Sequence, residues 1–171
     1  APNIRQLIQT SNSITKWAAW EILRAPSAAA RAKLILKVVR VGLELRRLNN
    51  FNAMMEMYAA ISLSSVTRLK KTWEGLKTKD KAQYDELAKL TDNSESFKVM
   101  RSIVHSCQPP LLPYLGIYLT DLTFIEEGNV SLVEEDGESF VNYRKMQMMA
   151  DVILEIQQYQ QLPYTGTKDN V

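Results

Sequence analysis

Residues 113–129 read PYLGIYLTDLTFIEEGN. The apolar and aromatic residues that follow Pro113 predict a helix, and the Gly-Asn pair predicts its end. Glu126 and Glu127 are adjacent near that end. Because neighbours on a helix diverge by roughly 100°, these carboxylates cannot flank one bond as the paired acids of a glycosidase do. The ordinary interpretation is a charged helix end before Gly128, although negative charge at a helix C-terminus mildly opposes the helix dipole.

Apolar residues recur at three- and four-residue spacing on both sides of this segment, as is typical of helices packed on a core. Only 6 glycines and 6 prolines occur in 171 residues, and no long stretch alternates at a period of two. Ser27, directly after Pro26, is the expected N-cap of one helix. We predict an all-α fold with at least about six helices and no sheet of three or more strands. The apolar and aromatic residues that indicate these helices are Ile14, Trp17, Ala18 and Ile22; Leu34, Val38, Val41, Leu45 and Leu48; Phe51, Met54, Met55, Tyr58 and Ile61; Tyr84, Leu87 and Ala88; Phe97, Met100, Ile103 and Val104; and Phe140, Tyr143, Met149, Val152, Ile153, Ile156 and Tyr159.

The composition is that of about one domain and argues against several classes of protein. A net charge of +2 argues against a dedicated nucleic-acid binder. Cys107 is the only cysteine, so no intramolecular disulfide can form, which fits a reducing compartment. No apolar run approaches the roughly 18 residues of a membrane span, so we expect no direct membrane insertion. The first residues do not form a signal-peptide pattern, since Arg5 and Gln6 interrupt the apolar ones. Because the start lacks methionine, we expect the chain to be a piece of a longer protein.

The usual catalytic constellations are missing. His105 is the only histidine, so no histidine pair can bind zinc, and we expect neither a metal site nor a cofactor. His105 and Cys107 are two residues apart, where side chains on a helix point to different sides. We interpret them as the end of a helix rather than as a nucleophile pair. No phosphate-binding glycine loop occurs, so the chain is not expected to bind nucleotide itself.

A basic cluster surrounds Trp73. A cationic face with a stacking aromatic residue would suit nucleic acid, whereas a solvated surface with Trp73 turned inward is the ordinary alternative. We favour the second interpretation and expect no nucleic-acid partner. The members of the cluster are Arg68, Lys70, Lys71, Lys77, Lys79 and Lys81.

Three segments together resemble the catalytic domain of Ras guanine-nucleotide exchange factors (RasGEF). They are LNNFNA at residues 48–53, SSVTRLKKTW at residues 64–73, and a proline pair at 109–110 followed by the segment 113–129. Residues 142–145 and 156–160 extend the match. Order and spacing agree with the later part of that domain over residues 1–164, which leaves 165–171 as a tail. Members of the family have further helices before the point where this chain begins.

The resemblance implies a helical bundle from which a helical hairpin, about residues 117–159, projects. The first arm would run from about Ile117 to Glu127, and a connecting loop would span residues 128 to about 137. The second arm would return along Phe140 to Tyr159. The implied activity involves no covalent chemistry and is not that of an enzyme in the usual sense: the hairpin opens the nucleotide site of a small GTPase of Ras, Rap or Ral type.

The resemblance also implies the site residues. Thr123 would crowd the magnesium site of the GTPase, and Glu127 would place negative charge near the phosphate. They are one helical turn apart and therefore share a face. The GTPase-binding residues implied are Tyr114, Thr120, Asp121, Phe124, Asn129 and Thr67, with Tyr114 against the GTPase's switch region.

Two positions depart from the pattern of the family. Thr123 replaces a bulky apolar residue that some members carry, although threonine also occurs there. Ser62 stands where many members have an asparagine of the GTPase contact surface. Two functions therefore stay open: an active exchange factor, and a non-catalytic helical adaptor that binds a small GTPase without exchange. The resemblance implies a cytoplasmic protein, recruited to membranes through other parts of the full-length protein.

Overall fold

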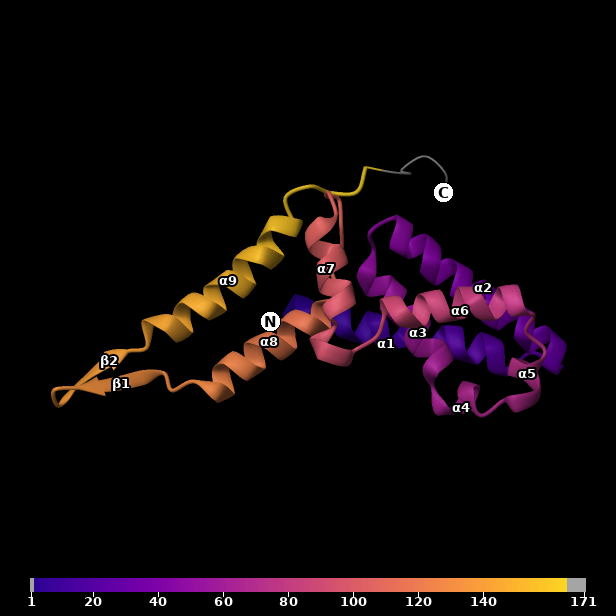
Figure 1. Ribbon diagram of the computed structural model, residues 1–171, viewed down its shortest axis with the longest axis horizontal. Coiled ribbons are helices and arrows are strands. Elements are labelled where there is room, and N and C mark those ends of the chain that lie inside the picture. Colours follow the sequence, from indigo (N-terminus) through magenta and orange to yellow (C-terminus); the bar gives the residue numbers. More distant parts are fainter. Residues whose placement is uncertain (1, 166–171) are drawn as a thin grey trace. The chain divides into compact units, whose positions relative to one another are not determined.

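Helices form most of the computed structural model, which describes residues 2–165 (Figure 1). The predicted all-α fold is confirmed, and a two-stranded sheet is the only sheet within the described residues. The chain divides into two compact units that meet in the sequence at Cys107 and Gln108. Nearly all of the predicted tail lies outside the described residues. The elements are α1 (Pro2–Leu23), α2 (Ala28–Arg47), α3 (Phe51–Ser62), α4 (Ser64–Thr67), α5 (Lys70–Glu74), α6 (Thr78–Leu90), the short 3₁₀ helix η1 (Ser94–Ser96), α7 (Lys98–Ser106), α8 (Leu115–Gly128), β1 (Leu132–Glu135), β2 (Glu138–Val141) and α9 (Tyr143–Tyr159).

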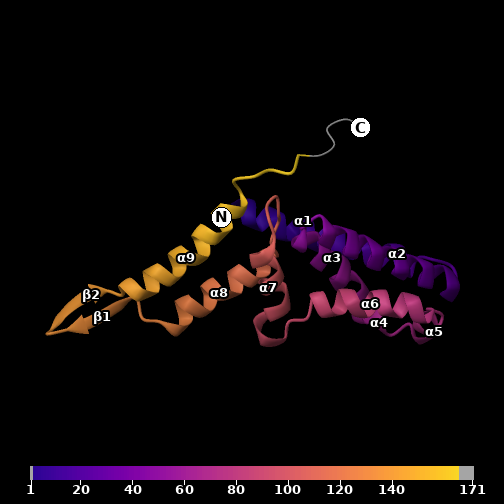
Figure 2. The same ribbon diagram turned by 45° about the horizontal axis from the view of Figure 1, so that its top comes forward.

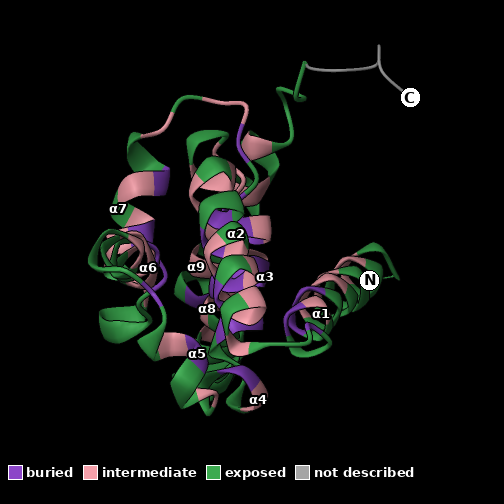
Figure 3. Ribbon diagram, turned by 90° about the vertical axis from the view of Figure 1, so that its right-hand side faces the viewer, coloured by how far each residue is buried: buried purple, intermediate pink, exposed green. Residues whose placement is uncertain are grey.

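The core of the first unit forms around α2 and α3. Helix α2 packs against α1, α3, α5 and α6, and α1 also packs against α3. Figure 3 shows buried residues on the facing sides of α2 and α3. Met54 of the predicted stripe is buried, as is Met57, whereas Met55 of that stripe is half-buried. Ser27 accepts a hydrogen bond from the Ala30 N–H at 3.1 Å, and this confirms the predicted N-cap of α2.

The stripe predicted over α2 lies on a helix, but it is not the side that the helix buries. Val41 and Leu48 of that stripe are exposed, whereas the buried residues of α2 are Ala32, Ile35, Val39 and Gly42. Helix α2 is apolar on more than one side, so spacing alone leaves two overlapping stripes. Small residues decide between them, because they let neighbours approach closely. A Cβ on Gly42 would lie 3.0 Å from Leu87 Cδ2 of α6. In α1, Trp17 of the predicted stripe is likewise exposed.

The LNNFNA segment makes the turn from α2 into α3. Asn49 adopts a left-handed backbone conformation with φ 57°, which asparagine tolerates better than most residues. Asn50 then caps α3 by accepting the Ala53 N–H at 2.9 Å. The side-chain amide of Asn52 donates to Glu56 at 2.8 Å and to Ser11 of α1 at 3.1 Å. Asn49 therefore supplies the backbone conformation of the turn, and Asn50 and Asn52 pair with polar groups of α3 and α1.

The second unit is a helical hairpin with a β-ribbon at its end. Helices α8 and α9 pack against each other and lie side by side in both Figure 1 and Figure 2. Strands β1 and β2 pair antiparallel between them, with Val133 opposite Phe140. The expectation of a simple loop after Gly128 is therefore wrong, and Phe140 belongs to a strand rather than to the second helical arm. That arm begins at Tyr143.

The turn of the ribbon explains this difference. Asp136 and Gly137 connect the strands with φ of 52° and 79°. Two consecutive residues with positive φ match the right-handed twist of a two-residue β-hairpin, and Asp-Gly is among the strongest sequence signals for it. All residues of both strands are exposed, so no alternation of burial marks them. The acidic residues of this segment led to the expectation of a loop, although the Asp-Gly pair within it is a signal for a β-hairpin.

Candidate functional site

Helix α8 has one face against α9 and one open face. Ile117 and Tyr118 are buried, and Asp121, Leu122 and Ile125 of the same face are half-buried. The open face is formed by residues spaced three and four apart, all exposed: Thr120, Thr123, Phe124 and Glu127. Four of the predicted site residues thus lie on one stripe, called here the α8 stripe. Asp121 lies on the half-buried side instead.

The chemistry of the α8 stripe combines an aromatic ring, two threonines and a carboxylate. Phe124 is 65% exposed, so its phenyl ring is accessible to a partner. The hydroxyls of Thr120 and Thr123 donate to the carbonyl oxygens of Gly116 and Leu119, each at 2.9 Å. The carboxylate of Glu127 has no hydrogen bond or ion pair among the described residues.

Two further predicted residues lie at the ends of α8. Tyr114 precedes the helix and is half-buried. A Cβ on Gly116 would overlap the phenol ring of Tyr114, so the ring lies over this glycine and would have to shift if a side chain were added. Asn129 follows the helix, and its amide donates to the Ile125 carbonyl at 3.0 Å. Asn129 therefore caps a free carbonyl of the last turn.

Thr67 and Ser62 belong to the first unit and are not part of the α8 stripe. Thr67 is exposed at the end of α4. Ser62 is exposed at the end of α3, where it lines a surface hollow together with Met55, Tyr58 and Phe97. The departure at Ser62 thus falls on an accessible surface with apolar neighbours.

Hydrogen bonds between side chains connect α8 to α9. The hydroxyls of Tyr118 and Tyr159 donate to the same oxygen of Glu155, at 2.8 and 2.9 Å. Burial, together with the neighbouring Glu155 carboxylate, raises the pKa of the Tyr118 phenol far above its usual value. An ionised Tyr118 could no longer donate its hydrogen bond, and its negative charge would be repelled by the Glu155 carboxylate.

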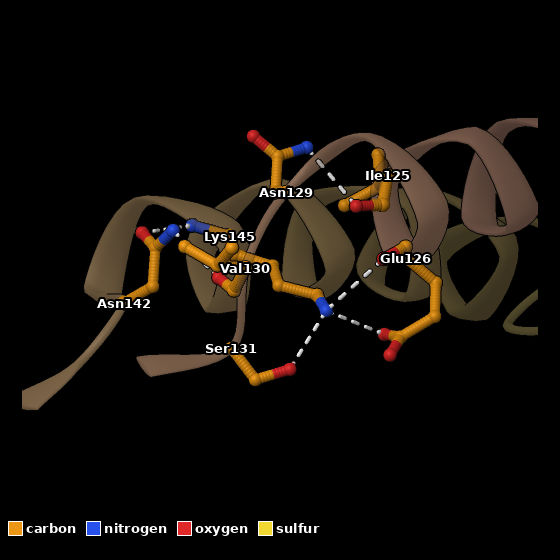
Figure 4. A network of polar contacts seen from close by, with 7 residues as sticks. All are labelled: Ile125, Glu126, Asn129, Val130, Ser131, Asn142 and Lys145. Atoms are coloured by element: carbon orange, nitrogen blue, oxygen red, sulfur yellow. Dashed lines mark hydrogen bonds and ion pairs between the residues drawn. The ribbon is translucent and has the colours of Figure 1, made fainter. Parts of the chain in front are cut away.

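Sequence reasoning missed a second set of polar contacts between α8 and α9, at the end of the hairpin that joins the β-ribbon. The Lys145 ammonium group contacts Glu126 and Ser131, and the backbone N–H of Lys145 donates to the side chain of Asn142 (Figure 4). We call these four residues the Lys145 network. The adjacent acids therefore differ, because Glu126 pairs with Lys145 while Glu127 faces outward. A sequence signal existed: Lys145 shares a helical stripe with Met149, Val152 and Ile156.

The remaining candidate sites take structural roles. The indole N–H of Trp73 donates to the Val66 carbonyl at 3.0 Å, and its ring meets Tyr84 edge-on at 5.0 Å between centroids. Trp73 is thus turned inward from the basic cluster, as favoured above. His105 and Cys107 end α7 as expected.

Residues 2–165 contain neither a cluster of three or more metal-ligating side chains nor a helix able to span a membrane. In that range, no group of three or more His, Cys, Asp or Glu side chains is arranged to hold a metal ion. Among the described helices, none combines the length and apolar character that crossing a bilayer requires.

Comparison with known proteins identifies relatives of the chain. Residues 1–147 match the RasGEF domain. Ras guanine nucleotide exchange factors B and Y of Dictyostelium discoideum are 41% and 43% identical to it over 164 and 165 residues, 96% of the chain and 10% and 11% of those proteins. Ras-specific guanine nucleotide-releasing factor 1 of Rattus norvegicus is 42% identical over 163 residues, 95% of the chain and 13% of that protein. The chain thus spans about a tenth of the length of these relatives. With the helical hairpin and these matches together, the chain belongs to the RasGEF domain family.

Proposed function

We propose that the chain promotes the release of guanine nucleotide from a Ras-subfamily small GTPase by inserting its α8–α9 hairpin beside the nucleotide. The observation that carries this proposal is the α8 stripe, an open helix face with a 65% exposed phenyl ring and an unpaired carboxylate. The relatives named above carry exchange or releasing activity in their names. We further propose a cytoplasmic location, with recruitment to membranes through other parts of the full-length protein.

The proposed mechanism is a linkage between binding equilibria. An exchange factor accelerates release only if it binds the nucleotide-free GTPase more tightly than the loaded one. Each tenfold difference corresponds to about 1.4 kcal/mol. No covalent step is required, so the side chains of the α8 stripe contribute through shape and charge.

Glu127 supplies the charge in this mechanism. At about 5 Å and an effective dielectric constant of about 20, two unit charges of like sign repel by about 3 kcal/mol. A carboxylate held near the phosphate position would therefore oppose the return of the nucleotide without opposing the empty GTPase. Thr123, one turn away on the same face, would occupy space near the magnesium ion.

The other predicted residues would serve docking. Phe124 and Tyr114 offer aromatic surface of the kind that dominates binding energy at interfaces. Thr120, Asp121 and Asn129 would add polar contacts along α8. Thr67 would contribute from the first unit.

A GTPase-binding adaptor without exchange activity is the alternative, and the departure at Ser62 favours it, since a changed contact surface can retain binding and lose catalysis. Release of fluorescent nucleotide from a panel of Ras, Rap and Ral proteins separates the two. Accelerated release from at least one GTPase supports the exchange factor. Binding that leaves the release rate unchanged supports the adaptor.

The site assignment is tested by Glu127→Gln, which keeps the shape of the side chain and removes its charge. We expect the maximal release rate to fall by about tenfold or more, with affinity largely kept, because the lost repulsion separates the two states. Glu126→Gln is a poor control, since Glu126 pairs with Lys145 at 3.0 Å. Glu134→Gln, in the exposed strand β1, makes the same change in net charge. Equal effects of the Glu127 and Glu134 variants would refute the role given to Glu127.

A further inference from the structure

A buried lysine lies where the two arms of the hairpin join the β-ribbon. The side chain of Lys145, in the first turn of α9, is only 1% exposed. Its Nζ atom lies 2.9 Å from Ser131 Oγ, 3.3 Å from the Glu126 carbonyl oxygen and 3.0 Å from Glu126 Oε2 (Figure 4). One ammonium group thus connects the start of α9 with the last turn of α8 and with the segment that leads into β1.

The three contacts match what an ammonium group needs. It carries three N–H donors and no acceptor, and three oxygens surround it. Burial of a charge is costly unless partners replace water, so loss of these contacts would leave an uncompensated group. A cation at a helix C-terminus is also favoured by the helix dipole. Lys145 thus pairs with Glu126, one of the two adjacent acids at the end of α8.

Asn142 connects the same two chain segments through hydrogen bonds with their backbone atoms. Its side-chain oxygen accepts the Lys145 N–H at 3.1 Å, and its amide donates to the Val130 carbonyl at 2.8 Å. Its backbone N–H donates to the Ser131 carbonyl at 2.9 Å. The chain leaving α8 and the chain entering α9 are therefore tied to each other at adjacent points.

The consequence concerns the orientation of the α8 stripe. The carbonyl held by Lys145 belongs to Glu126, one residue before Glu127. The paired carboxylate is that of Glu126, which leaves the Glu127 carboxylate as the outward charge of this helix end. A shift in the last turn of α8 would move Glu127 relative to any docked partner, and displacements of about 1 Å can change rates by about a hundredfold.

We propose that Lys145 is a positioning residue for nucleotide exchange, which fixes the last turn of α8 so that Glu127 projects at the required angle. This role rests on the proposed function. Lys145 itself touches neither nucleotide nor GTPase in this scheme and acts through the orientation of α8.

The test compares Lys145→Met with Arg144→Met in the 171-residue chain. Methionine keeps most of the length of the side chain and removes its charge and donors. Arg144 is the exposed neighbour on α9, so its variant makes the same change in net charge. Single-turnover release of fluorescent nucleotide, measured over a range of chain concentrations, gives a maximal rate and a half-saturating concentration. Hydrogen exchange of the amides of residues 123–128 reports on the last turn of α8 without a GTPase.

We expect Lys145→Met to lower the maximal rate by about tenfold or more, to change the half-saturating concentration by less than about threefold, and to speed hydrogen exchange in residues 123–128. Arg144→Met should leave all three at wild-type values. Ser131→Ala, an exposed change that removes one of the three contacts, should shift the same quantities in the same direction by less. This graded variant keeps the test decisive if Lys145→Met unfolds the chain.

A wild-type maximal rate in Lys145→Met, equal losses in Arg144→Met, or an effect confined to the half-saturating concentration would overturn the proposal. Ser131→Ala with unchanged exchange in residues 123–128 would also contradict it. If the wild-type chain releases nucleotide from no GTPase, the proposed function fails and the role in exchange fails with it. In that case, the hydrogen-exchange comparison alone decides whether Lys145 holds the end of α8.

Discussion

Replacing Tyr118 by phenylalanine removes one hydroxyl from the interface between α8 and α9 and keeps the ring. The lost hydrogen bond is 2.8 Å long and ends on the Glu155 carboxylate. Hydrogen bonds to charged groups contribute about 1.5–3 kcal/mol. Tyr159 still donates to the same oxygen at 2.9 Å, so we expect the lower end, a loss of about 1.5 kcal/mol in the free energy of unfolding near neutral pH.

The loss should depend on pH. The pKa of Tyr118 is raised in the folded chain, whereas an unfolded tyrosine titrates near about 10. Above that pH the unfolded state loses a proton that the folded state keeps, so the wild type loses stability as pH rises, by about 1.4 kcal/mol per pH unit. The variant has no phenol at position 118, so it does not lose stability through this ionisation. The difference between the two proteins should therefore shrink above about pH 10 and vanish near about pH 11.

Urea unfolding followed by far-ultraviolet circular dichroism, repeated between about pH 7 and pH 11, measures this difference. Tyr143→Phe is the matched control, because Tyr143 is 77% exposed at the start of α9. That variant should stay within about 0.5 kcal/mol of the wild type at every pH. A stability difference for Tyr118→Phe that is constant across this range would show that the phenol titrates normally and would refute the reasoning.

Three other substitutions follow from the site and the fold. Tyr114→Ala should weaken GTPase binding by roughly 2 kcal/mol or more if the ring is a central anchor; unchanged affinity in calorimetry with a large drop in melting temperature would mean that the ring serves only the fold. Gly116→Ala would place a Cβ in the ring of Tyr114, so GTPase affinity should fall even though alanine favours a helix by about 1 kcal/mol over glycine; retained affinity would contradict this. Asn50→Ala should lower the free energy of unfolding by about 1 kcal/mol through loss of the α3 cap, and a change below about 0.3 kcal/mol in urea unfolding would argue against the cap.

Much of the helical architecture could be predicted from the sequence, because proline positions and three-four spacing are local signals. Helix α8 and the N-cap Ser27 were predictable for this reason. The buried side of α2 was not, since its apolar residues surround the helix. What decided it was the close approach of Leu87 to Gly42, a contact between residues far apart in the chain.

The candidate site also has one part that could be predicted from the sequence and one part that could not. The α8 stripe follows from helical spacing once the helix is known, so Thr120, Thr123, Phe124 and Glu127 could be grouped in advance. Lys145 could not be assigned from residue type, because a lysine is ordinarily exposed. Its partners come from the end of α8 and from the segment before β1, and only the closed hairpin brings them together. The roles of all these residues toward a GTPase stay predictions.

The hydroxyl of Thr123 has a consequence for how substitutions on α8 should be interpreted. Since it donates to the Leu119 carbonyl within its own helix, its hydrogen-bonding capacity as a donor is already used. What remains for an incoming surface is the methyl group and the lone pairs of the hydroxyl oxygen, which can still accept a hydrogen bond. A bulky apolar residue at the same position of a related protein would then differ from Thr123 in volume and in the loss of this acceptor, and valine would match it in shape alone.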